Sequence, residues 1–167
     1  FRRVLFRSGE EGFGYCRETA KAASESLGIP EDSVLVASTG VIGMQLPIDR
    51  IANGVKAMAP KLEGSREAGL EAAKAIMTTD TEKKEAAVEI EIGGKTVTVG
   101  GMCKGSGMIH PNMCTMLGFI TSDVDISKEL LQEALSEDIK DTYNMVSVDG
   151  DTSTNDTVLL LANGQAG

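Results

Sequence analysis

The richest set of chemically useful residues lies in a glycine-rich stretch, residues 100–116. It holds one lysine, Lys104, and a threonine, Thr115, at the head of an apolar run. The P-loop pattern GxxxxGK[ST] is absent, and the dinucleotide pattern GxGxxG fails after Gly107. Two interpretations remain: a long crossover between strands, or a loop whose glycines let the backbone approach a reactive group.

The other reactive side chains of this stretch favour packing over catalysis. His110, the one histidine of the chain, precedes a proline, and a structural role is favoured. No base is evident near Cys103 or Cys114, so we interpret both thiols as buried and unreactive. Three cysteines without a CxxC pair indicate neither a disulfide framework nor a zinc site. We therefore expect no metal and a reducing, cytoplasmic location.

A second polar segment, residues 149–156, has the sequence DGDTSTND and looks at first like a calcium loop. An EF-hand needs Gly at its sixth position and Glu at its twelfth, where this chain has Thr154 and Leu160. We interpret the segment as a turn in which Asx and hydroxyl side chains satisfy backbone groups. Calcium binding stays as the alternative.

Composition excludes several classes of function. The chain has 167 residues, of which 41% are apolar and 25% charged, as in ordinary globular domains. Its net charge of −9 repels phosphate backbones and anionic lipids, so we expect no nucleic-acid or membrane partner. No apolar run approaches the ~20 residues that span a bilayer.

The elements that must position these residues follow from apolar periodicity. Helical spacing predicts four helices, over residues 10–27, 47–58, 64–77 and 127–140. Alternation on both sides of Gly93-Gly94 predicts a β-hairpin with a primed turn and one buried face. Further apolar runs predict strands at residues 33–37 (buried), 116–121, 143–148 and 157–161. This order favours an α+β fold over a doubly wound parallel sheet.

Four stretches together resemble the ornithine acetyltransferase (glutamate N-acetyltransferase) family of arginine biosynthesis. They are residues 34–43, 75–81, 104–118 and 149–157. The resemblance runs from about Gly9 to the end of the chain and covers well under half of a full-length member. It therefore implies a partial family domain over residues 9–167, preceded by a non-matching or foreign segment, residues 1–8.

The resemblance implies an incomplete layered α+β sandwich of the N-terminal-nucleophile-like type (DmpA/ornithine acetyltransferase-like). Members cut themselves before a threonine, which here is the Cys114–Thr115 bond, giving an α-chain part (9–114) and a β-chain part (115–167). The freed α-amino group of Thr115 has a pKa near ~7.7–8.0 and is a suitable base for its own hydroxyl. Cys114 stands where the family usually has alanine.

The family also implies the remaining site residues. The Thr39 hydroxyl and the Gly40 N–H would form the oxyanion hole; without the resemblance, this Thr-Gly pair reads as a turn at a strand end. Substrate contacts carry over to Thr78, Lys104 and Thr115. Lys104 is the one cation of its loop and would pair with a substrate carboxylate, with a solvated lysine as the alternative.

The implied activity is acetyl transfer from N2-acetylornithine to glutamate through an acetyl-threonine intermediate. No metal or organic cofactor is needed, although acetyl-CoA is a possible donor substrate, as in members that are also amino-acid N-acetyltransferases. The α and β chains would associate as an α2β2 heterotetramer. Two alternatives stay open: a related self-processing amidase or aminopeptidase, and an inactive fragment that only packs with its missing segments.

Overall fold

The structure is a computed structural model that describes residues 2–41, 43–110, 116–153 and 155–167, with side chains from residue 9 onward. The chain divides into two compact units, Phe1–Ala68 and Gly69–Gly167. No helix within the described ranges is long and apolar enough to cross a membrane.

The first unit is helical. Helix α1 (Arg2–Leu27) is broken at Gly9, where φ is 65° and ψ is −170°. It ends at Gly28, whose positive φ and N–H bond to the Ser24 carbonyl (2.9 Å) are typical of a glycine C-cap, as the sequence predicts. Helix α2 (Ile48–Met58) packs against α1 and continues into the short 3₁₀ helix η2 (Ala59–Lys61).

The buried strand predicted over residues 33–37 is wrong. The short 3₁₀ helix η1 (Glu31–Ser33) comes first, and no described strand pairs with the residues that follow it. Val34 is extended, but the Leu35 side chain is 49% exposed. An apolar run becomes a strand only where a neighbour accepts and donates its backbone hydrogen bonds, and within the described residues none does.

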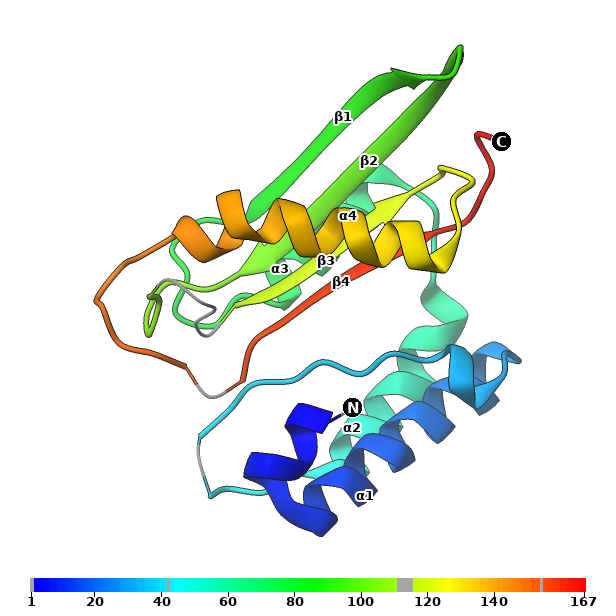
Figure 1. The fold of residues 1–167 in the computed structure, drawn as a ribbon. Coiled ribbons are helices and arrows are strands. Elements are labelled where there is room, and N and C mark those ends of the chain that lie inside the picture. Colours follow the sequence, from blue (N-terminus) through cyan, green and yellow to red (C-terminus); the bar gives the residue numbers. More distant parts are fainter. Residues whose placement is uncertain (1, 42, 111–115, 154) are drawn as a thin grey trace. The chain divides into compact units, whose positions relative to one another are not determined.

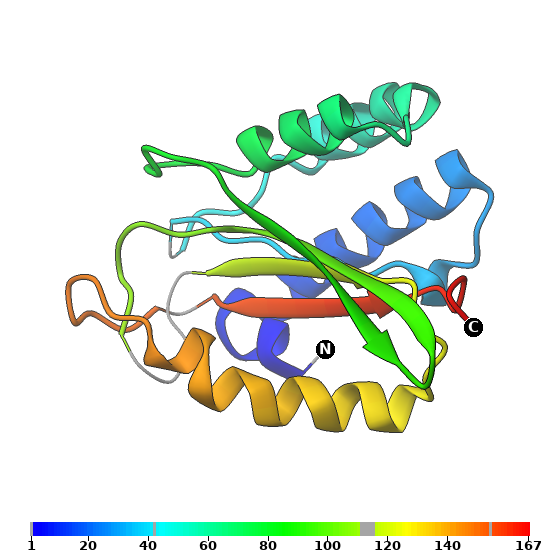
Figure 2. The same ribbon diagram turned by 90° about the horizontal axis from the view of Figure 1, so that it is seen from above.

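The second unit is built on a mixed sheet of four strands in the order β1-β2-β3-β4 (Figure 1). The strands are β1 (Lys84–Ile92), β2 (Lys95–Lys104), β3 (Leu117–Ser122) and β4 (Thr157–Ala162). The first three are antiparallel neighbours, whereas β3 and β4 are parallel. Helix α4 (Lys128–Asp141) runs along one face of this sheet (Figure 2), and helix α3 (Arg66–Ala75) spans the boundary between the units. The α+β prediction is confirmed.

The predicted hairpin is present, but its buried face is not. Gly93 and Gly94 have φ values of 59° and 79°, as a primed turn requires. Every residue of β1 is exposed, including Val88 at 56%, while Val97 on β2 is buried. The register between β2 and β3 begins only at Val99, so the tip of the hairpin extends beyond the third strand, where Ile90 and Ile92 are exposed and Val97 is buried.

The segment between β3 and β4 agrees with the prediction at its helix and differs from it after the helix. Ser127 caps α4 as expected, accepting a hydrogen bond from the Leu130 N–H. The strand predicted over residues 143–148 is wrong, because the chain forms a 3₁₀ turn, η3 (Tyr143–Met145). The Tyr143 phenol lies against Gly118 of β3, where an added Cβ would meet its oxygen at 3.1 Å. A turn therefore delivers this ring to the sheet, and a strand would not.

Candidate active site

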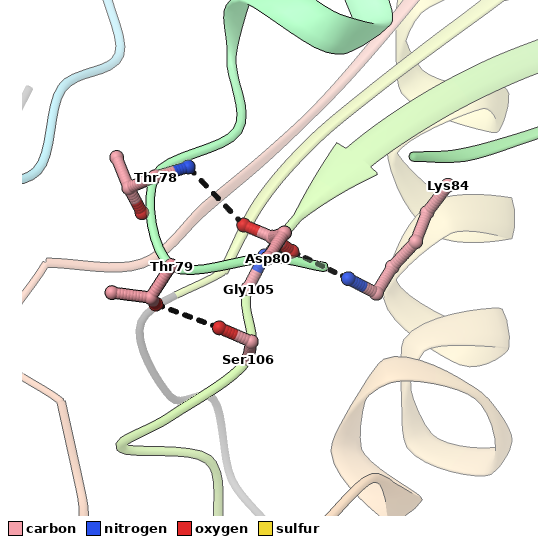
Figure 3. A network of polar contacts seen from close by, with 6 residues as sticks. All are labelled: Thr78, Thr79, Asp80, Lys84, Gly105 and Ser106. Atoms are coloured by element: carbon pink, nitrogen blue, oxygen red, sulfur yellow. Dashed lines mark hydrogen bonds and ion pairs between the residues drawn. The ribbon is translucent and has the colours of Figure 1, made fainter. Parts of the chain in front are cut away.

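The glycine-rich loop begins where β2 ends, and a buried carboxylate holds its first residues (Figure 3). The Gly105 N–H donates to Asp80 Oδ1 at 2.8 Å, and the Lys84 ammonium donates to the same oxygen. The Thr78 N–H donates to Asp80 Oδ2 over a longer 3.4 Å. Asp80 follows helix α3, so one side chain joins the end of that helix to the end of β2.

This carboxylate is charged despite being buried. The side chain of Asp80 is only 1% exposed, and burial by itself would raise its pKa. The hydrogen bonds from Lys84 and from the amides of Gly105 and Thr78 outweigh burial and lower the pKa to about 2. Asp80 is therefore ionised at neutral pH and is a strong acceptor for the loop amide.

A second hydrogen bond joins the same two segments. The hydroxyls of Thr79 and Ser106, the residues before Asp80 and after Gly105, lie 2.7 Å apart (Figure 3). Thr78, predicted to contact substrate, is exposed beside this pair of contacts. The structure thus brings the segment of Thr78 to the residues that follow Lys104.

Lys104 is the last residue of β2 and pairs in the sheet with Leu117. The residue is 4% exposed. Among the residues that the structure describes, no carboxylate forms an ion pair with its ammonium group. A cation removed from water is costly unless an anion accompanies it. A ligand that carries a carboxylate would supply that anion.

Further along the loop, the Asp149 carboxylate binds two backbone amides. Its Oδ2 accepts the Met108 N–H at 2.6 Å and its Oδ1 accepts the Ile109 N–H at 3.0 Å. The Met108 hydrogen bond is the main reason that the pKa of Asp149 is lowered, with the Ile109 amide adding to it. Met108 has a φ of 54°, a left-handed conformation that a non-glycine residue adopts at a cost when its surroundings hold it there.

The far side of the loop is held by the same polar segment. Asp156 Oδ1 accepts the Met116 N–H at 3.0 Å, and the Thr157 N–H donates to the Met116 carbonyl, also at 3.0 Å. Cys114 and Thr115, the predicted cleavage residues, lie outside the described residues. Their described neighbours on both sides are bonded to one stretch of chain, residues 149–157.

The turn interpretation of this segment is confirmed in part, because Asp149 and Ser153 bind backbone groups within it while Asp149 and Asp156 also bind the loop. The Asp151 N–H donates to Asp149 Oδ1 at 3.3 Å, and the Asn155 N–H donates to Ser153 Oγ at 3.1 Å. In the described part of the chain, no group of three or more His, Cys, Asp or Glu residues is arranged to hold a metal ion. The carboxylate of Asp149 is engaged by backbone amides of the loop.

The remaining candidates differ in their surroundings. Thr39 is half-buried and Gly40 is exposed, both in the irregular segment of the first unit, and their oxyanion role stays a prediction. Cys103 is half-buried beside the Asp80 contact, and burial raises the pKa of its thiol most, against an opposing effect of Lys84. A neutral thiol agrees with the unreactive role expected for Cys103.

Sequence reasoning missed the three carboxylates that hold the loop. Asp80 lies in a short polar run that follows a helix. Its place between two threonines, shortly before a strand, is the only sequence signal that could have drawn attention to it. Asp149 and Asp156 were expected to satisfy their own turn. Their bonds to residues some 40 positions away in the chain have no local sequence signal, and the Asp156 bond lies beside the first parallel pair of β3 and β4.

Comparison with solved structures gives related folds. The chain is similar to the crystal structure of arginine biosynthesis bifunctional protein ArgJ from Bacillus halodurans, with 44% identity and a TM-score of 0.57, covering 64% of this chain and 55% of that one. It is also similar to ornithine acetyltransferase from Mycobacterium tuberculosis in complex with ornithine, with 35% identity and a TM-score of 0.52, covering 63% and 55%.

Comparison with curated sequences gives a longer match. Arginine biosynthesis bifunctional protein ArgJ of Symbiobacterium thermophilum is 57% identical over 96% of this chain, and that of Lactococcus lactis is 53% identical over 95%. The chain spans 39% of the length of each of these relatives. The family model described as the ArgJ family matches residues 6–167. This chain belongs to the ArgJ family.

Proposed function

We propose that the full-length protein, meaning a protein of the relatives' length that carries this sequence, transfers acetyl from N2-acetylornithine to glutamate in arginine biosynthesis. Family membership supports this proposal, because the curated relatives are named as bifunctional proteins of arginine biosynthesis. The Mycobacterium tuberculosis relative is an ornithine acetyltransferase with ornithine bound. Acetyl-CoA is a possible second donor, and we propose that no metal or organic cofactor takes part.

The observation that carries the proposal is the buried residue Lys104, whose ammonium group has no counter-ion among the described residues. Both N2-acetylornithine and glutamate carry an α-carboxylate, and either would provide the missing anion. Thr78, on the segment joined to the loop by Asp80, would contact the same substrate. A solvated lysine would instead be expected at an exposed position.

The proposed nucleophile is Thr115, freed by self-cleavage. Its hydroxyl attacks the carbonyl of Cys114, and the peptide C–N bond breaks as an ester forms, which frees the α-amino group of Thr115. Water then hydrolyses the ester, which leaves a carboxylate on Cys114 and a free hydroxyl on Thr115. In catalysis this amine takes the hydroxyl proton as the oxygen attacks the acetyl carbonyl of N2-acetylornithine. Ornithine leaves with that proton, and the amine of glutamate then attacks the acetyl ester and regenerates the hydroxyl.

The oxyanion formed at each acyl step needs hydrogen-bond donors. We assign these to the Thr39 hydroxyl and the Gly40 N–H, each worth about 3 kcal/mol of transition-state stabilisation if they act as such donors usually do. The fold would be a layered sandwich of the N-terminal-nucleophile type once the full length is present. Its α and β chains would stay associated as an α2β2 assembly in the cytoplasm.

Transfer of a labelled acetyl group tests the proposal. The full-length protein is expected to move label from N2-acetylornithine to glutamate, and Thr115→Ala is expected to abolish both self-cleavage and transfer. Thr115→Ser, which keeps a hydroxyl, is the matched control and should retain part of each activity. Self-cleavage that persists in Thr115→Ala contradicts the mechanism. Labelled acetate without N-acetylglutamate would instead identify an amidase, and an intact, inactive wild type would identify an inert precursor.

A further inference from the structure

Asp80 joins the two segments that carry the proposed substrate contacts Thr78 and Lys104. Its carboxylate accepts the Gly105 N–H, directly after Lys104, although Asp80 and Gly105 are 25 residues apart in the chain. The same carboxylate accepts the Thr78 N–H (Figure 3). The proposed function gives roles to Thr78 and Lys104 and none to Asp80.

The contact is more than a surface ion pair. Lys83 and Glu85 form such a pair beside it, with side chains 37% and 38% exposed and no bond to the described part of the loop. Asp80, in contrast, is 1% exposed and binds backbone amides of both segments as well as the Lys84 ammonium. Backbone amides cannot swing away as side chains do, so this carboxylate fixes the spacing between the segments.

Two further contacts sharpen this arrangement. The Thr79–Ser106 hydroxyl bond joins the segments at a second point, which restricts rotation about the first. The Lys84 ammonium occupies one oxygen of Asp80 and balances its charge. With Asp80 balanced in this way, the positive charge of Lys104 stays available for an anion from solution.

We propose that Asp80 is a positioning residue that holds Thr78 and Lys104 at the spacing required by the two polar ends of one amino-acid substrate. This inference rests on the proposed function and deepens it. Asp80 acts through the backbone of its neighbours and does not touch the substrate. Its loss therefore weakens substrate binding before it affects the acyl steps at Thr115.

Steady-state kinetics of the full-length protein tests this role with Asp80→Asn. An amide keeps the shape of the side chain, but its nitrogen donates where a carboxylate oxygen accepts. We expect the KM for N2-acetylornithine to rise about tenfold or more, with kcat within about threefold of wild type and self-cleavage complete. The matched control Lys83→Gln, which breaks only the neighbouring exposed pair, should keep the wild-type KM.

Two further variants keep the inference testable even if Asp80→Asn does not fold. Asp80→Glu keeps the charge but moves the oxygens by one methylene, so it should fail to restore KM. Thr79→Val removes only the second contact and should raise KM by about threefold. A wild-type KM in Asp80→Asn, or in Thr79→Val where Asp80→Asn is unfolded, overturns the inference.

Other results count against it as well. A KM restored by Asp80→Glu would mean that charge alone matters. A loss confined to the fraction of enzyme that forms acetyl-enzyme, at unchanged KM, would mean that Asp80 only supports folding. If wild-type protein transfers acetyl and the variants give either of these results, the inference about Asp80 fails and the proposed function remains supported. Wild-type protein that transfers none would remove the proposed function, and this inference with it.

Discussion

Asp80 and Asp149 hold the same loop in opposite environments. Asp80 is buried, binds the loop at Gly105, and is balanced by the Lys84 ammonium. Asp149 is exposed and binds the loop at Met108 and Ile109 through backbone amides alone. The pKa of each is lowered, at Asp80 to about 2.

The difference separates two kinds of anchor. Removing a buried carboxylate leaves its hydrogen-bond donors without an acceptor. Water can take the place of an exposed carboxylate. Asp80 should therefore matter for stability and for the spacing of the substrate contacts. Asp149 and Asp156 should matter for the path of the chain around the proposed cleavage bond, where the backbone includes the left-handed Met108.

The largest expected effect is on stability. Asp80→Ala leaves the buried Gly105 N–H without an acceptor and Lys84 without its partner, at a cost of about 3 kcal/mol. Asp149→Ala should cost clearly less, because Asp149 is exposed and water can take its place at the exposed Met108, so that only the buried Ile109 loses its partner. Urea unfolding of the two full-length variants, followed by circular dichroism, measures the difference. Equal losses would break the comparison.

Acid should reduce the stability that the buried Asp80 carboxylate contributes. The folded-state pKa of Asp80 is about 2, below its ordinary value of 3.8. Its stabilising contribution, on the order of 2 kcal/mol, is therefore complete above about pH 4 and is lost as the pH falls towards 2. The free energy of unfolding should fall more steeply between pH 4 and about 2 in wild type than in Asp80→Asn. Parallel curves for the two proteins would show that Asp80 is not a buried, paired carboxylate.

The smallest of the three effects concerns self-cleavage. Asp156 binds the amide of Met116, the residue after the proposed nucleophile, so Asp156→Asn should slow cleavage about tenfold by letting that residue shift. Mass spectrometry of samples taken over time measures the rate. Asp151→Asn is the matched control, because only the backbone N–H of Asp151 takes part in the described network. Equal rates in the two variants would remove Asp156 from processing.

Local features of the fold could be predicted from the sequence. The Gly93-Gly94 turn and the Ser127 cap depend on residues within one turn of chain, and both are confirmed. The strand predicted over residues 33–37 and that predicted over 143–148 are wrong, because pairing depends on partners elsewhere in the chain. Tyr143, predicted in a strand, lies instead in a turn, and its ring lies against Gly118 of β3.

The candidate site divides in the same way. Lys104 and Thr78 could be proposed from the family resemblance, and Lys104 is buried without an ion-pair partner among the described residues. Asp80 could not, because its role arises from a contact between a helix end and a strand end. The parallel register of Leu117 with Thr157 likewise brings Asp156 to Met116, and nothing in either segment alone indicates that meeting.

The central claim is that a freed Thr115 accepts the acetyl group. Its most direct test is the intact mass and peptide map of the full-length protein before and after mixing with N2-acetylornithine without glutamate. The account predicts a fragment that begins at Thr115 and gains one acetyl group on that residue's hydroxyl. An uncleaved chain, or a fragment beginning at Thr115 that gains no acetyl group, would contradict it.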